Sequence, residues 1–413
     1  MNTITDKPIV VILGGNILNF GVYEYCKNKG YNTVVVDWSP NANLKGDLFL
    51  CIDVKDYQAI IAALRDHNIT DIAGAYTSID LAVRSVNMIN RHYGLSSMPD
   101  AALDNCLQKA QMTRIWQENN LLNRYSQLFE NYDSEIEKLA EEKKIILKPN
   151  ISASSRGITI IDKGGDVNTL ANAFEKAKRE SYDKKVIVEE YVEGQEFTCE
   201  MLGDHEGNVS VYAISVKYHT ENTTNNKIAV KLHYNSNIYP DSIYEKIAET
   251  GKACYRSLGF KSCFGHLEIL MKPDGTLSPV EIGARSSGYI ANPLVTLASQ
   301  HDFFGGYLSM LSGEKLPPRD YINGSGSSMY FFYDIPYDTE VVHPCSLMEF
   351  LPYGVVSSYH NRSKLMTNGY RFSQITNDNE RIGYEIISGS RDLMSIGTIC
   401  QAETKFISKL TGK

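Results

Sequence analysis

The chain has 413 residues, of which 43% are hydrophobic and 22% are charged, and its formal net charge at pH 7 is −8. These values are ordinary for globular proteins and predict about two or three domains. The acidic balance disfavours a general binder of nucleic acids or membrane surfaces, which would carry a basic surface. No apolar run approaches the ~20 residues of a membrane span.

The cysteines and the first residues of the chain indicate its compartment. Eight cysteines are scattered singly, without a C-x-x-C pair, and this favours reduced thiols over a disulfide framework or a zinc site. The start of the chain lacks the basic stretch and the small-residue cleavage site of a secretory signal. We therefore expect a cytoplasmic protein.

The first part of the chain alternates apolar strands with helical segments. Strands are predicted at 9–13, 31–36, 48–52 and 72–75, a helical stretch ends near residue 29, and further helices lie near 56–66 and 80–93. This order predicts a doubly wound parallel α/β domain, to which we assign residues 1–110. Pro99-Asp100 opens another helix, which is predicted to carry Lys109. The fingerprint G-x-G-x-x-G is absent after the first strand, so a dehydrogenase is the least favoured function.

From residue 143 onward the pattern changes to an α+β arrangement. Strands are predicted at 145–148, 157–161, 186–190, 196–202, 209–216 and 228–232 and in a hairpin over 264–282, with helices at 133–142, 168–180 and 241–257. We assign residues 111–318 to a central domain of two α+β subdomains. Residues 319–413 are assigned to a strand-rich C-terminal lobe of the α+β type. The polar segment 220–226 and the loop 152–157 are candidate lids.

The hairpin around Asp274-Gly275 is the most informative segment. A two-residue loop of this sequence favours a type I′ turn, because both central residues need a positive φ. Counting outward from the turn places Pro273 opposite Thr276, Ile269 opposite Val280 and Glu268 opposite Glu281. The predicted buried face then consists of Leu267, Ile269, Met271, Val280 and Ile282.

The same register places two carboxylates directly opposite each other on the second face. Like charges in this position destabilise a sheet, so we expect a positive charge between Glu268 and Glu281. Mg²⁺ suits such a site, because it prefers one or two carboxylates together with substrate phosphates. Arg285, just past the strand, can hold further anionic oxygens. The alternative is a solvated hairpin with two outward glutamates.

Two further segments are suited to binding a nucleotide. Lys148 ends a predicted buried strand and precedes the serine- and glycine-rich loop, whose N–H groups and hydroxyls can surround phosphate oxygens. The strand–turn–strand segment 186–198 carries Glu189, Glu190 and Glu196. An extended linker of this kind can bind adenine through its backbone, and a carboxylate can accept the ribose hydroxyls. The alternatives are an ordinary serine-rich loop and three exposed glutamates at a strand edge.

The order of these features along the chain resembles the ATP-grasp superfamily, specifically its carboxylate–amine ligases, including bacterial L-amino-acid (dipeptide) ligases. The resemblance covers nearly the whole chain. The residues that carry it are, in order, Lys109, Lys148 with its Ser/Gly loop, Glu189-Glu190-Tyr191-Val192, Glu196, Glu268, Glu281 and Arg285. One position departs from the pattern of many members, which have an asparagine metal ligand where this chain has Gly283, and this leaves the coordination of a second metal open.

The resemblance also implies a role for each of these residues. The lysines Lys109 and Lys148 would hold the ATP phosphates, beneath a loop that contains Ser154, Ser155 and Gly157. Adenine would be bound by Glu189, Glu190, Tyr191 and the backbone of Val192, and the ribose by Glu196. The carboxylates Glu268 and Glu281 would bind Mg²⁺, or Mn²⁺ in its place. The catalytic residues would be Arg285, acting on the transferring phosphoryl group, and Lys148.

The function that the resemblance implies is ATP-dependent ligation of a carboxylate to an amine through an acyl phosphate, with ADP and phosphate as products. Amino acids are the expected small-molecule substrates, nucleic acids and membranes are not expected partners, and a homodimer is compatible. An alternative is a nucleotide-pathway or carbamoyl-phosphate-synthase-like enzyme acting on bicarbonate or a phosphorylated small molecule. A basic cluster in the N-terminal domain would favour it, but Arg65, Arg84 and Arg91 are scattered. A non-catalytic nucleotide-binding protein is a third hypothesis.

Overall fold

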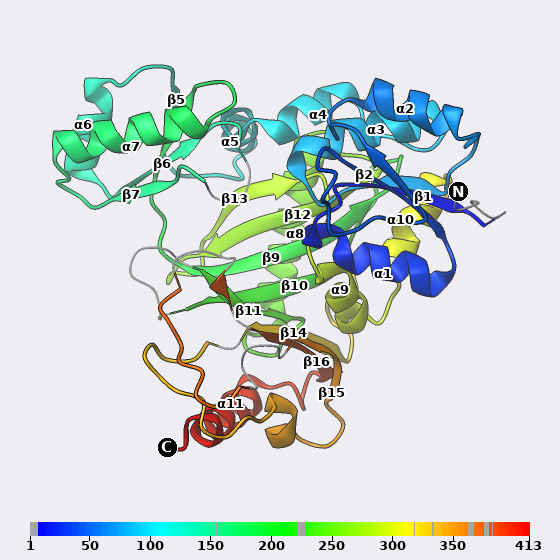
Figure 1. Ribbon diagram of the computed structural model, residues 1–413. Coiled ribbons are helices and arrows are strands. Elements are labelled where there is room, and N and C mark those ends of the chain that lie inside the picture. Colours follow the sequence, from blue (N-terminus) through cyan, green and yellow to red (C-terminus); the bar gives the residue numbers. More distant parts are fainter. Residues whose placement is uncertain are drawn as a thin grey trace.

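The structure is a computed structural model that describes residues 7–152, 156–220, 228–317, 319–332, 334–361, 367–375, 380–381 and 383–413. Within these ranges the strands form three sheets, two of four strands and one of eight. Figure 1 shows an N-terminal α/β unit and a small α+β unit that both lie against the large sheet, with the C-terminal residues at the opposite end of that sheet. Ser154, Ser155 and the candidate lid 220–226, apart from Thr220, lie outside the described residues.

The N-terminal unit is the parallel α/β sheet that the sequence predicts. Its strands β1 (Ile9–Leu13), β2 (Asn32–Asp37), β3 (Leu48–Cys51) and β4 (Gly74–Tyr76) lie in the order β3-β2-β1-β4. All pairings are parallel. The helices α2 (Tyr57–Asp66) and α3 (Val83–His92) pack on one face, and α1 (Phe20–Lys29) and α10 (Phe303–Leu311) pack on the other. Burial on both faces explains why these strands are continuously apolar.

The helix predicted to open at Pro99-Asp100 and to carry Lys109 is in fact two helices, α4 (Asp100–Leu107) and α5 (Lys109–Glu118). Gln108 between them has an extended backbone, with φ −112° and ψ 110°. Asn150 satisfies the free N–H groups at the start of α5, because its backbone oxygen accepts from Lys109 at 3.2 Å and its Oδ1 accepts from Ala110 at 2.9 Å. Lys109 is therefore fixed beside the loop that follows Lys148.

The small unit is an antiparallel sheet covered by two helices. Its strands β5 (Ser126–Phe129), β6 (Ile145–Pro149), β7 (Thr159–Ile161) and β8 (Val186–Glu190) lie in the order β5-β8-β6-β7. The helices α6 (Ser134–Glu142) and α7 (Val167–Glu180) share one apolar core with this sheet. The sequence interpretation missed β5, whose four residues carry little apolar alternation.

The large sheet continues from the central part of the chain into the C-terminal part. Its order is β13-β12-β9-β10-β11-β14-β16-β15. The strands are β9 (Gln195–Gly203), β10 (Val209–His219), β11 (Ala229–Tyr234), β12 (Cys263–Met271), β13 (Leu277–Gly283), β14 (Gly326–Phe332), β15 (Val356–Asn361) and β16 (Tyr384–Ser390). The predicted strand-rich end of the chain thus holds strands, but it finishes on a helix that the sequence interpretation missed, α11 (Ile396–Thr411).

The two faces of the large sheet differ in chemistry. One face is apolar and packs against α8 (Asp241–Ser257) and α5. The other face carries a cluster of polar side chains from neighbouring strands, namely Glu196, Thr198, Glu200, Ser215, Lys217, His266 and Glu268. Part of it is covered by α9 (Ala291–Ser299), which shares a core with the N-terminal unit. Within the described ranges, no helix has the length and apolar character needed to cross a membrane.

The hairpin of β12 and β13 pairs Glu268 with Glu281 as predicted, but its turn differs. Lys272 and Thr276 are bonded across the turn, and Gly275 has a φ of +79°, so three residues form the loop instead of two. The predicted pairings Ile269–Val280 and Pro273–Thr276 are therefore wrong, because Ile269 pairs with Pro279. A bulge then inserts Val280 as an extra residue and restores the register at Glu281.

The bulge also changes the predicted buried face. Leu267, Ile269 and Ile282 are fully buried in the core beneath α8, and Met271 packs at its margin. Val280 was expected beside them, but the bulge turns it toward the polar face, where it lines a cleft with Glu268 and Glu281.

Candidate functional site

A cleft of about 210 Å³ lies on the polar face, between the β12–β13 hairpin, the end of β6 and the loop after β4. Its lining residues are Asp80, Lys109, Lys148, Pro149, Ser152, Ile158, His266, Glu268, Val280, Glu281, Gly283 and Arg285. The structure thus brings together five residues that the sequence singled out, Lys109, Lys148, Glu268, Glu281 and Arg285. We call this space the phosphate cleft.

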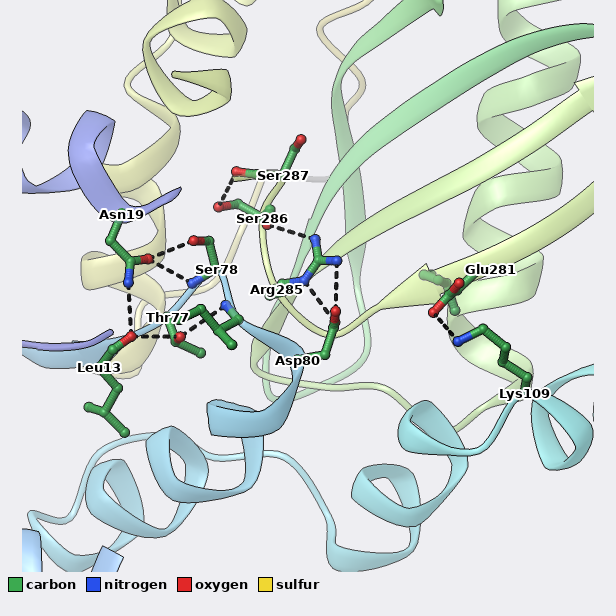
Figure 2. Close-up of polar contacts among 12 residues, drawn as sticks. Leu13, Asn19, Thr77, Ser78, Asp80, Lys109, Glu281, Arg285, Ser286 and Ser287 are labelled. Carbon is green, nitrogen blue, oxygen red and sulfur yellow. Dashed lines mark hydrogen bonds and ion pairs between the residues drawn. The ribbon is translucent and has the colours of Figure 1, made fainter. Parts of the chain in front are cut away.

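Each of the two opposed carboxylates has its own lysine partner. Lys109 Nζ lies 3.0 Å from Glu281 Oε1 (Figure 2), and Lys217 Nζ lies 3.3 Å from Glu268 Oε1. Burial would lower the pKa of Lys109, but Glu281 raises it above its usual value. Each carboxylate therefore has an ammonium partner within the protein itself.

The two carboxylates also fit a divalent cation. Glu268 and Glu281 face each other and offer only oxygen ligands, which Mg²⁺ prefers. Among the described residues, no group of three or more His, Cys, Asp or Glu side chains is placed to hold a metal ion. A cation here would need further oxygens from a bound molecule, as phosphates provide.

Arg285 is held by an acidic residue from the N-terminal unit. Its Nε and Nη2 donate to the two carboxylate oxygens of Asp80 at 2.7 and 3.0 Å, and its Nη1 donates to the backbone oxygen of Ser286 at 3.2 Å (Figure 2). Burial alone would raise the pKa of Asp80, but the guanidinium holds it below its usual value. Both side chains line the phosphate cleft.

The loop that carries Asp80 is fixed to the end of β1. Thr77 Oγ1 donates to the backbone oxygen of Leu13 at 2.8 Å, and Asn19 Oδ1 accepts from the Ser78 N–H at 2.8 Å (Figure 2). Asn19 is fully buried and donates to the same Leu13 oxygen at 2.8 Å. Loops at the carboxyl ends of parallel strands are the usual place for binding residues, and here such a loop directs a carboxylate at Arg285.

Lys148 belongs to a buried network of three charged side chains, with Glu189 at its centre. Glu189 accepts from Lys148 Nζ at 2.7 Å and from Arg124 Nη2 at 2.9 Å, and the Glu189 side chain is only 2% exposed. Burial alone would raise the pKa of Glu189, but Lys148 and Arg124 lower it to about 2. The resemblance assigned Glu189 to adenine. In the structure its carboxylate pairs with Lys148, which lines the phosphate cleft.

Glu189→Gln should destabilise the protein by about 3–5 kcal/mol at pH 7, because it leaves two buried cations without their carboxylate. The native pKa of Glu189 lies below its ordinary value, so its contribution is present above about pH 4.5 and is lost as the pH falls toward 2. Urea unfolding of both proteins between pH 7 and 3 checks this. The difference in unfolding free energy should shrink below about pH 4.5, and a difference independent of pH would contradict the assignment.

The predicted adenine segment lines a separate concavity of about 430 Å³, next to the hairpin turn. Its lining residues are Glu190, Tyr191, Val192, Glu193, Lys272, Pro273 and Asp274. Glu190 pairs with Lys143 at 2.9 Å, and the Lys144 ammonium lies 4.9 Å from the centre of the Tyr191 ring. Three of the residues predicted to contact adenine therefore line one concavity.

Two other predicted site residues, Glu196 and Gly157, lie outside the concavity that the predicted adenine segment lines. Glu196 lies on the polar face and pairs with Lys217 and His219; burial would raise its pKa, but these partners lower it to about 2. Gly157 has a φ of +74°, and a Cβ there would lie 2.8 Å from Glu180 Cβ and 2.9 Å from Pro149. Glycine is therefore required where the chain leaves the candidate phosphate loop.

The sequence interpretation missed several residues of the site. Asp80, Lys217 and Arg124 pair with predicted residues, and His266 lines the phosphate cleft. His266 Nδ1 lies 2.8 Å from Oε1 of the fully buried Glu200. The two-residue spacing of His266 and Glu268 on one strand was a usable signal, since it places both on one face. Asp80 had a weaker signal, its position after a parallel strand.

Comparisons with known proteins identify a domain family, sequence relatives and similar folds. A family described as an ATP-grasp domain matches residues 141–293. D-Alanine–D-alanine ligase B of Chromobacterium violaceum is 26% identical over 163 residues, which cover 38% of this chain and 49% of the relative. A putative D-alanine–D-lactate ligase of Streptomyces coelicolor is 31% identical over 138 residues, which cover 32% of this chain and 38% of the relative. The chain thus spans half or less of the length of these relatives.

Solved structures match over more of the chain. An L-amino acid ligase from Bacillus licheniformis superposes with a TM-score of 0.70 and 17% identity, covering 98% of both chains. A biotin carboxylase from Campylobacter jejuni superposes with a TM-score of 0.66 and 14% identity, covering 93% of this chain and 87% of the other. At such identities the likeness shows the fold alone, and the fold class expected from the sequence is confirmed. Residues 141–293 thus match an ATP-grasp domain, and the chain as a whole shares the fold of these solved structures.

Proposed function

We propose that this protein is an ATP-dependent carboxylate–amine ligase that works through an acyl phosphate. The observation that carries the proposal is the meeting of Lys109, Lys148, Glu268, Glu281 and Arg285 in one cleft. Two lysines, two opposed carboxylates and an arginine are the groups that phosphoryl transfer needs, since its catalysis rests on positioning and charge neutralisation.

The proposed reaction has two steps. A carboxylate oxygen of the first substrate attacks the γ-phosphorus of ATP, and ADP leaves with the electrons of the broken P–O bond. The nitrogen of the second substrate then attacks the carbonyl carbon, phosphate leaves, and the nitrogen loses a proton to give the amide. Lys109 and Lys148 bind phosphate oxygens, and Arg285 faces the transferring group. Glu268 and Glu281 would hold Mg²⁺, which neutralises phosphate charge when bound.

The nucleotide base would lie in the concavity at the hairpin turn, against Tyr191 and Val192. This concavity and the phosphate cleft lie at two ends of the same hairpin, because Lys272 lines the first and Glu268 the second. Amino acids are the proposed substrates, since the matched relatives are named as ligases of D-alanine with D-alanine or D-lactate, and a fold neighbour is named as an L-amino acid ligase.

The nucleotide-pathway alternative has less support from the described residues. A basic cluster in the N-terminal unit would favour this alternative. In the structure, however, Arg84 pairs with Asp104 and Arg91 pairs with Asp100 at the surface. Neither arginine lines the phosphate cleft. Neither arginine is therefore placed to hold a substrate phosphate in that cleft.

The products should be ADP and phosphate, and not AMP and pyrophosphate. The protein is incubated with ATP and amino acids, which are supplied singly and in pairs, and ADP release is measured. If two amino acids are joined, ADP release should depend on the presence of both members of a pair. Chromatography of the nucleotides and mass spectrometry of the amide check both points. AMP accumulating in step with product would contradict the acyl-phosphate route, and ADP release with bicarbonate or a sugar phosphate alone would favour the alternative.

A further inference from the structure

A second cleft of about 310 Å³ opens directly from the phosphate cleft. Four residues line both clefts and form the junction between them, namely Asp80, His266, Glu268 and Arg285. Because the transferring phosphoryl group would lie on the phosphate side of this junction, a substrate that reacts there extends into the second cleft. We call this second space the substrate cleft.

The junction carries charged groups of both signs. The Arg285 guanidinium lies against the Asp80 carboxylate (Figure 2), and the Glu268 carboxylate lines the same opening. An α-amino acid likewise carries an ammonium and a carboxylate on a single carbon atom, and each is attracted by a group of opposite charge. The junction is therefore suited to the backbone groups of an amino acid, whose side chain would then enter the substrate cleft.

Beyond the junction the substrate cleft is mainly apolar. Its aliphatic side chains come from separate parts of the chain, namely Leu18, Ile79, Leu232, Ile290 and Leu294. Ile79 directly precedes Asp80 of the junction. Ile290 caps the start of α9, and Leu294 lies about one turn further along that helix. The aliphatic wall thus begins beside the charged groups, where the side chain of an amino acid bound at the junction would lie.

Among the described lining residues beyond the junction, Arg381 alone is charged. The protein itself already engages its guanidinium. Nη1 donates to the backbone oxygen of Ala229 at 2.8 Å, and the guanidinium lies 4.2 Å from the centre of the Phe332 ring. The aliphatic groups therefore determine the character of the wall. The alternative, an acidic substrate side chain that pairs with Arg381, is tested below with glutamate.

The volume of the substrate cleft indicates the size of the side chain. A volume of 310 Å³ corresponds to roughly ten water molecules, at the ~30 Å³ that each occupies in the liquid. The methyl group of alanine would leave most of this space to water. A leucine or phenylalanine side chain would displace water from the aliphatic wall, and the binding free energy gained grows with the apolar area removed from water.

We propose that one of the two substrates is an α-amino acid with a large apolar side chain, which packs against the aliphatic wall of the substrate cleft. This inference rests on the proposed function and narrows its substrate class. The matched relatives are named for D-alanine, whose side chain is a single methyl group. The substrate cleft of this chain instead predicts a preference for leucine or phenylalanine over alanine.

Calorimetric titration of the full-length protein with Mg²⁺ and a non-hydrolysable ATP analogue tests this without turnover. The probes are leucine, alanine, asparagine and glutamate, each as the L and the D enantiomer, and the tighter-binding enantiomer of each is compared. Leucine should bind at least about tenfold more tightly than alanine, because it buries more apolar surface. It should exceed asparagine by at least as much, because asparagine has a similar size but a polar side chain. Glutamate should bind more weakly than leucine.

Leu232→Asn should remove most of the preference for leucine over alanine, because it puts a polar group of similar size into the aliphatic wall. The affinity for alanine should change little. Leu18→Asn should have the same effect, and it decides the test if Leu232→Asn does not fold, since Leu18 is 38% exposed. Leu128→Asn is the matched control, because Leu128 is 37% exposed and lines neither cleft. The control should keep the full preference.

Leucine that binds no more tightly than alanine, or not at all, would overturn the inference. Tighter binding of glutamate than of leucine would also overturn it, as would an unchanged preference in both Leu232→Asn and Leu18→Asn. These outcomes are separate from the proposed function. A protein that binds leucine through this wall but makes no amide fails only as a ligase. A ligase that joins only small or polar amino acids fails only this inference.

Discussion

Glu281→Gln should abolish turnover while the protein stays folded. We expect kcat to fall by about three orders of magnitude or more, equivalent to ~4 kcal/mol in the activation free energy. The change removes one of the two opposed carboxylates that would hold Mg²⁺ against the ATP phosphates. It also weakens the hold on Lys109, whose ammonium pairs with Glu281 at 3.0 Å. Stability should change little, because one of two like charges is removed from a partly exposed site.

The measurement is ADP release with those amino acids, single or paired, that support ADP release in the unmodified protein. A thermal melting curve is recorded on the same preparation. Glu245→Gln is the matched control, since Glu245 is an exposed glutamate on α8 that accepts from Asn323 at 3.3 Å. The control should keep full activity. A Glu281→Gln enzyme as active as the control would contradict the metal assignment.

Arg285→Lys should lower kcat by about a hundredfold and weaken ATP binding much less. Arg285 uses Nε and Nη2 on Asp80, and its Nη1 lies on the remaining edge of the fork. A lysine has one nitrogen, so it can keep the Asp80 partner or face the transferring phosphoryl group, but it cannot replace both contacts. An interaction that strengthens only in the transition state changes kcat more than binding.

Steady-state kinetics, ATP titration and thermal melting of Arg285→Lys separate this role from a purely structural one. If Arg285 only joined the two parts of the fold through Asp80, the variant would lose stability and keep its turnover per folded molecule. Arg371→Lys is a matched control, because Arg371 also pairs with two carboxylate groups, those of Asp338 and Glu340, but does not line the phosphate cleft. An unchanged kcat in Arg285→Lys would rule out a catalytic role.

Local patterns predicted the elements of the site better than their contacts. The β12–β13 hairpin could be located because alternation and a turn sequence are properties of neighbouring residues. Its carboxylate pair was correct although the turn was not, because the extra loop residue and the bulge at Val280 offset each other. Neither the loop length nor the bulge can be read from a count outward from Asp274-Gly275.

The contacts that escaped prediction join residues far apart in the chain. Asp80 and Arg285 are 205 positions apart, and Arg124 and Glu189 are 65 apart. Nothing in the sequence around Asp80 distinguishes it from other acidic residues after a strand. The resemblance assigned Glu189 to adenine together with Glu190, and the structure adds that the alternation along β8 turns Glu189 inward to Lys148 and Arg124. Such pairs depend on how the three sheets are arranged, which local periodicity does not encode.

The continuous eight-stranded sheet has a consequence for shortening this chain. β11 bonds to β14 along four residue pairs, and β14 bonds to β16 along seven. Removing the residues after 318 would therefore leave one side of β11 without a partner strand, although β11 would stay bonded to β10. Such an open edge can recruit strands from other molecules and aggregate. The C-terminal segment thus protects the edge of the sheet from self-association.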